Sequence, residues 1–160
     1  MAIRKPLVMV AGQIQRLQSG DTIDAPFTEV DVTTVTNGNA GSIVIGTPVY
    51  VSAADTVDKA QADAAGTMDA IGLVRDVSIA SSSAGVIQTD GILAATTTQW
   101  DAVAGTSGGL SAGTFYYLDP DTAGKITATA PTTVGQFVVR IGQAISTTEL
   151  EISFTDPIKL

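Results

Sequence analysis

The most constraining feature of this sequence is a six-residue pattern that occurs twice. Gly46-Thr-Pro-Val-Tyr-Val51 and Gly113-Thr-Phe-Tyr-Tyr-Leu118 both read Gly-Thr-x-x-Tyr followed by Val or Leu, and they lie 67 residues apart. Lys59 and Lys125 follow at an offset of 66, and two Ile-Gly pairs come later at an offset of 70. Offsets of this size predict one duplicated module with small loop insertions. The alternative is chance similarity in a chain rich in a few small residues.

The segment after each copy predicts a β-hairpin. In the second copy, Asp119-Pro-Asp-Thr-Ala-Gly124 supplies a Pro that fixes φ and a Gly that tolerates positive φ. The repeat extends this interpretation to the first copy, although residues 53–65 are rich in Ala and favour a helix by propensity. The glycine of each Ile-Gly pair indicates a bulge or a close backbone approach. Because an isolated hairpin is only marginally stable, the two modules need to bury their faces against each other or another chain.

The whole chain reads as short runs of Val, Ile and Thr bounded by Gly, Asp, Asn and Ser. This pattern predicts an all-β fold, a small β-barrel or β-sandwich built from two similar hairpin-containing modules. We expect an extended N-terminal arm and at most one short helix near 97–104, with a Thr cap and Trp100 turned inward. The expected parts are an N-terminal arm and docking segment (1–36), a first β module (37–96), a short helix and Gly-rich connector (97–111) and a second β module (112–160), with the modules packed as one domain.

Composition removes most catalytic chemistry. The chain has no Cys and no His, so a thiolate nucleophile, a Cys-based metal site and the usual neutral-pH general base are excluded. The turn from Asp119 to Asp121 lacks the further oxygen ligands of a calcium loop, which favours turn chemistry over a weak cation site. Glu149 and Glu151 alternate on a strand with Thr and Ser neighbours, as on a solvated face. We therefore expect no enzyme, no cofactor and no resident metal.

Charge and hydropathy limit the partners. The net charge is −8, which disfavours binding to the phosphate backbone of nucleic acid. No stretch of the sequence approaches 18 consecutive apolar residues, so we expect no membrane-spanning helix. A signal peptide is not expected either, because the apolar run that begins at Leu7 is short. The only local basic bias comes from Arg4, Lys5 and Arg16. These residues are either scattered surface charge or, with Pro6 and Leu7, a short docking arm for an acidic partner.

The adjacent tyrosines Tyr116 and Tyr117 are the remaining candidate contact residues. Neighbouring strand residues point to opposite faces, so one tyrosine is expected in the core and the other outside. The outer ring, joined by Tyr50 or Trp100, could serve core packing, subunit contact or glycan binding. These three interpretations stay open at the level of sequence.

Several stretches together resemble virion proteins of tailed bacteriophages: head decoration proteins, head-fibre proteins and the structural modules of tail fibres. They comprise Lys5 to Thr22, Gly109 to Leu118, Gly124 to Thr127, Ala130-Pro131, Gly135 to Val138 and Ile141 to Leu150. The middle of the chain, from Gly46 through Ile71-Gly72 to Gly91, is similar to small capsid-decoration proteins. These motifs are Gly, Tyr and Leu signatures of a β scaffold, so they specify architecture better than role.

The resemblance implies an all-β, usually trimeric protein with no catalytic residues. It predicts a non-enzymatic virion protein, assembled in the host cytoplasm, that binds the major capsid protein or another virion protein through its N-terminal segment. Charged residues make up 15% of the chain, below the usual quarter or so, which suits a surface covered by neighbours. The alternative function is a tail-fibre or baseplate adhesin module that recognises a host surface glycan.

Overall fold

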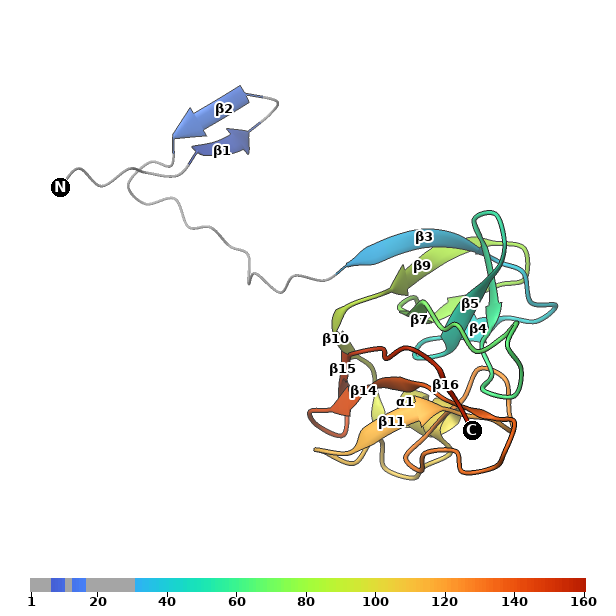
Figure 1. Cartoon of the computed structure of the whole chain (residues 1–160). Helices are drawn as coiled ribbons and strands as arrows, with labels where there is room; N and C mark the ends of the chain where they lie inside the picture. The colour runs from blue at the N-terminus through green and yellow to red at the C-terminus, as the bar shows by residue number, and fades with distance from the viewer. Residues whose placement is uncertain (1–6, 11–12, 17–30) are drawn as a thin grey trace.

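The computed structural model describes residues 7–10, 13–16 and 31–160. The described residues form sixteen strands and one short helix, which confirms the predicted all-β class (Figure 1). Two units follow one another along the chain. We call β3 to β9 the first module and β10 to β15, with the helix α1, the second module. The eight-residue α1 is far too short to cross a bilayer, and the described part of the chain contains no longer helix.

The first module is a closed five-stranded barrel with the strand order β3-β6-β5-β7-β9. Its strands are β3 (Val32–Asn37), β5 (Pro48–Ala53), β6 (Thr56–Lys59), β7 (Gly72–Val74) and β9 (Ala84–Gln88). All neighbours are antiparallel except β3 and β6, which close the barrel by parallel pairing of Thr36 with Thr56 and Asn37 with Val57. A small sheet of β4 (Ile43–Val44) and β8 (Ser78–Ile79) adds to its core, which contains Val35, Ile43, Val49, Val57, Val74, Ile79 and Ile87.

The second module is a five-stranded sheet with the order β10-β15-β14-β11-β12. Its strands are β10 (Gly91–Ala94), β11 (Phe115–Leu118), β12 (Ile126–Thr127), β14 (Arg140–Ala144) and β15 (Glu149–Ile152). A separate two-stranded sheet joins β13 (Phe137–Val138) to β16 (Ile158–Lys159). The Val- and Ile-rich stretches at residues 71–79 and 136–145 are each divided between two strands, the first between β7 and β8 and the second between β13 and β14.

The two modules repeat one arrangement of strands. The strands of the first module pair in the order β3-β9-β7-β5-β6, and those of the second pair in the order β10-β15-β14-β11-β12. When the two orders are aligned, the matched strands also follow one another in the same order along the sequence. The matched glycines Gly46 and Gly113 both have left-handed φ, +81° and +79°. Gly72 pairs with Val49 and Gly142 pairs with Tyr116, and these two pairs occupy equivalent places in the repeat. The structure thus confirms the duplication and both hairpins, β5–β6 and β11–β12.

Lys59 and Lys125 do not occupy equivalent positions in this structural repeat. Lys59 lies in β6 opposite Val49, whereas Lys125 precedes β12 and its carbonyl accepts from the backbone of Asp119. The first hairpin turns at residues 54–55, with Asp55 at φ 53°, and the second has a longer loop over residues 119–125. The different loop lengths place the two lysines at different positions on their hairpins.

The second module is not closed by strand pairing, because among the described strands β10 and β12 do not pair. The helix α1 (Thr97–Ala104) follows β10 directly and contacts β12. The ammonium group of Lys125 donates a hydrogen bond to the backbone carbonyl of Ala102. Thr96 caps the helix in a capping box with Gln99. The predicted helix and its Thr cap are therefore confirmed. Trp100 is fully buried, which confirms its predicted inward turn.

The module boundaries differ from the expected residue ranges. β3 lies almost entirely within residues 1–36, expected as an arm, yet it pairs with β9 over five residues and closes the barrel. β10 lies within residues 37–96 but pairs with β15 of the second module. Both differences arise because the first strand of each module pairs with the last strand, far away in sequence.

The modules share one hydrophobic cluster and are joined by backbone hydrogen bonds. Gly124 donates to Ala60 at 2.7 Å, Ala62 donates to Asp119 at 3.1 Å and Phe137 donates to Ala62 at 2.9 Å. Side chains of the first module, Ile45, Ala60, Ala62 and Leu73, pack with those of the second, among them Trp100, Tyr116, Leu118, Ile126, Ile141 and Leu150.

Candidate partner-binding surfaces

The predicted docking segment is described in part. Arg4, Lys5 and Pro6 lie outside the described residues. Leu7 and Arg16 lie opposite each other in an antiparallel hairpin of β1 (Leu7–Val10) and β2 (Gln13–Arg16). These two strands pair only with each other among the described strands. The structure therefore brings together two of the predicted contact residues on one hairpin.

The two adjacent tyrosines have opposite environments. Tyr116 is 1% exposed, and its hydroxyl accepts a hydrogen bond from the backbone N–H of Ser111 at 3.0 Å. Tyr117 is partly exposed on the other face of β11. Trp100 is buried, and its indole Nε1 donates to the carbonyl of Thr148 at 3.0 Å. Of the side chains considered for an aromatic platform, Tyr116 and Trp100 are therefore core residues and cannot contact a partner in this fold.

Tyr117 belongs to what we call the outer sheet face, the solvent side of the sheet in the second module. Cross-strand neighbours there run from Ile92 on β10 through Glu151 on β15 and Gln143 on β14 to Phe115 on β11. Ile92 and Phe115 are 39% and 40% exposed. The guanidinium of Arg140 lies over the Phe115 ring, 5.2 Å from its centroid, as in a cation–π contact.

Sequence reasoning did not single out Phe115, Ile92 or Gln143. Alternation along the strand places Phe115 on the same face as Tyr117, but the sequence did not decide which tyrosine lies outside, so it could not predict that Phe115 is exposed. Ile92 and Gln143 carried no such signal, since their place beside Phe115 depends on the pairing of β10 with β15 and of β14 with β11.

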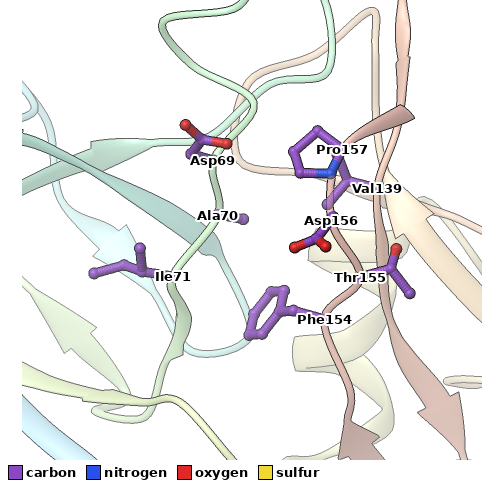
Figure 2. A pocket seen from close by; sticks show the side chains of 8 residues that line it. All are labelled: Asp69, Ala70, Ile71, Val139, Phe154, Thr155, Asp156 and Pro157. Atoms are coloured by element: carbon purple, nitrogen blue, oxygen red, sulfur yellow. The ribbon is translucent and has the colours of Figure 1, made fainter. Parts of the chain in front are cut away.

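A cleft of about 210 Å³ lies where the modules meet (Figure 2). Asp69, Ala70 and Ile71 form one wall, and Phe154 to Pro157 form the other with Val139. Figure 2 shows the Asp69 and Asp156 carboxylates on opposite walls. Two carboxylates beside an aromatic ring make this cleft suitable for a positively charged group rather than an anion.

The Asp119 carboxylate binds backbone groups of its own turn. One carboxylate oxygen of Asp119 accepts from the backbone N–H groups of Asp121 and Thr122, at 2.7 and 2.8 Å. These bonds are typical of turn chemistry. Among the described residues, no group of three or more acidic, His or Cys side chains is positioned to hold a metal ion.

The Gly-rich connector is also held by a carboxylate. Asp101 of α1 accepts from the backbone N–H of Gly109 at 2.7 Å, that of Gly108 at 3.0 Å and the hydroxyl of Thr106 at 2.9 Å. The bond from Gly109 is the main cause that lowers the pKa of Asp101 below its usual 3.8. An ionised side chain therefore holds this loop, and the Gly-rich segment from residue 105 to 113 is not followed by the Gly-Lys-(Ser/Thr) of a phosphate-binding loop.

The fold and its surfaces define a duplicated all-β protein with an N-terminal hairpin that pairs with no other described strand. In comparisons with known proteins, the chain matches no protein-family model and no curated protein sequence.

Proposed function

We propose that this chain is a non-enzymatic structural protein of a bacteriophage virion, most specifically a head decoration or head-fibre protein, that binds the capsid surface through its N-terminal hairpin. The β1–β2 hairpin carries the proposal. A lone two-stranded hairpin is marginally stable in water, so one that pairs with no other described strand favours stabilisation by a binding partner.

Charge distribution supports the same role. Residues 1–20 contain three basic residues and no acidic ones, whereas residues 31–160 contain five basic and thirteen acidic residues. Arg16 lies on this basic segment, directly across from Leu7. A segment whose sequence combines basic and apolar residues suits an acidic shell protein, while the acidic body avoids non-specific contact with packaged nucleic acid.

The resemblance to decoration proteins extends the proposal to the oligomeric state of the protein and its location on the virion. The protein would act as a homotrimer, assembled in the host cytoplasm and carried on the virion, with the major capsid protein as its first partner. Sparse charge suits such a crowded surface.

Binding of the full-length protein to capsids that lack it tests the proposal. Arg16→Glu and Leu7→Asp should each weaken co-sedimentation by about tenfold or more, a loss of about 1.4 kcal/mol or greater. Arg75→Glu is the matched control, because Arg75 is exposed directly after β7 and undergoes the same charge change. Unchanged binding by both hairpin variants, or equal loss with Arg75→Glu, contradicts docking through the hairpin.

A further inference from the structure

The outer sheet face has a symmetric order of side-chain types. Its central row reads Ile92, Glu151, Gln143 and Phe115 across β10, β15, β14 and β11, with each residue directly opposite the next. The row is therefore apolar at both ends, with a hydrogen-bond acceptor and a donor between them. Ile92 and Phe115 remain 39% and 40% exposed, and the guanidinium of Arg140 lies over the Phe115 ring at 5.2 Å from its centroid.

This order is self-complementary when a second copy lies face to face with the first. The two-fold axis then runs parallel to the strands, midway between the two sheets and over the line between β15 and β14. It places β10 of one copy opposite β11 of the other, and β15 opposite β14. Ile92 of one copy then faces Phe115 of the second copy, and Glu151 faces Gln143. Both contacts occur twice, as in any isologous interface.

The polar pair in the middle can form a hydrogen bond across this contact. Gln143 donates one amide hydrogen to the carbonyl of its own Gly113 at 2.9 Å. An amide nitrogen has two hydrogens, so the second is available to a carboxylate oxygen of Glu151 in the facing copy. A charge-assisted bond of this kind is stronger than a neutral one.

We propose that the outer sheet face binds a second copy of this chain through this two-fold arrangement. A second copy is favoured over a foreign partner because only a copy supplies the same row in reverse order. The inference does not depend on the capsid role. At a strand spacing of about 4.8 Å the row is roughly 14 Å wide, so the interface is small and association is expected in the micromolar range.

Sedimentation equilibrium of the full-length protein at micromolar concentrations tests this arrangement. The wild type should contain species of two chains, each of 16.3 kDa, or of six if a three-fold contact elsewhere joins the dimers. The double variants Ile92→Lys/Phe115→Lys and Ile92→Glu/Phe115→Glu should each lose this two-fold association, because like charges meet at both ends of the row. Mixed in equal amounts, they should restore it as a heterodimer.

The control is Val51→Lys, a barrel residue that is 56% exposed, which should leave the mass unchanged. Circular dichroism checks that every variant folds. A monomeric wild type, a trimer without dimers or hexamers, or a mixture that fails to associate overturns the proposal. It is also overturned if the double variants lose capsid binding with no change in mass, because a foreign partner would then cover this face.

Discussion

At the scale of single residues, the repeated Ile-Gly glycines are needed because another strand passes close by. A Cβ at Gly142 would lie 2.1 Å from the backbone oxygen of Glu151, and one at Gly72 would lie 2.9 Å from that of Gln88. Both obstacles are backbone atoms, so the sheet itself must move. Gly142→Ala should therefore destabilise the fold by about 1–3 kcal/mol, and Gly72→Ala by less. Urea unfolding followed by circular dichroism measures both.

Gly66→Ala is the matched control for these substitutions, because a Cβ there meets no atom within 4 Å. Its effect should stay within about 0.5 kcal/mol. If Gly142→Ala is as mild as Gly66→Ala, the close approach of β14 and β15 is wrong.

Asp101 gives a residue-scale prediction about pH. Its pKa is lowered in the folded protein, chiefly by the N–H of Gly109. A carboxylate with a depressed pKa stabilises its loop above the unfolded value of 3.8, and this contribution is lost as the pH falls through the folded pKa. Hydrogen-exchange protection of the Gly108 and Gly109 amides should therefore fall below about pH 4.

Asp101→Asn should abolish this pH dependence. The amide keeps an acceptor for Gly109 but places an N–H donor where the second carboxylate oxygen accepts from Gly108. Protection of Gly108 should be low in this variant at neutral pH as well. Equal protection in wild type and variant at neutral pH would refute the loop-anchoring role.

At the scale of elements, α1 occupies the place where strand pairing would close the second module. Its Trp100 is fully buried against the first module, where a Cβ on Gly46 would lie 2.9 Å from the indole ring. Trp100→Ala should cost about 3–5 kcal/mol. Trp100→Phe keeps an aromatic ring but loses the bond to Thr148, so it should cost less, about 1–3 kcal/mol. Equal losses in chemical unfolding would show that packing of the ring contributes little.

The elements also show how far sequence patterns could predict this fold. Gly46, Gly113 and the Ile-Gly pairs predicted the central strands and their hairpins because turns and close approaches depend on residues near in sequence. The parallel closure of β3 on β6 and the place of β10 had no such local signal. Long-range pairing depends on the packing of complete modules, and the first strand of each module pairs with the last.

The same limit applies to the candidate surfaces. Alternation along β11 was enough to place one tyrosine inside, but it did not decide that Tyr116 was the buried one. The row from Ile92 to Phe115 requires four strands from distant parts of the sequence. The cleft between Asp69 and Asp156 exists only once the modules pack, so no pattern within either module predicts it.

At the scale of the whole molecule, the shared cluster and the hydrogen bonds around Ala60 and Ala62 link the stability of the two modules. We expect one cooperative unfolding transition. Ile87→Val in the barrel core and Ile141→Val in the second module are matched deletions of one methylene from fully buried side chains. Each should cost about 0.5–1.5 kcal/mol.

Cooperativity predicts that either substitution shifts every probe by the same amount. Fluorescence of the single Trp100 reports on the contact between the modules, and amide signals of Val35 and Ile87 report on the barrel. In calorimetry the van't Hoff and calorimetric enthalpies should agree. If Ile87→Val moves the barrel signals but leaves the Trp100 transition in place, the duplicated modules unfold separately, and their shared cluster does not couple them.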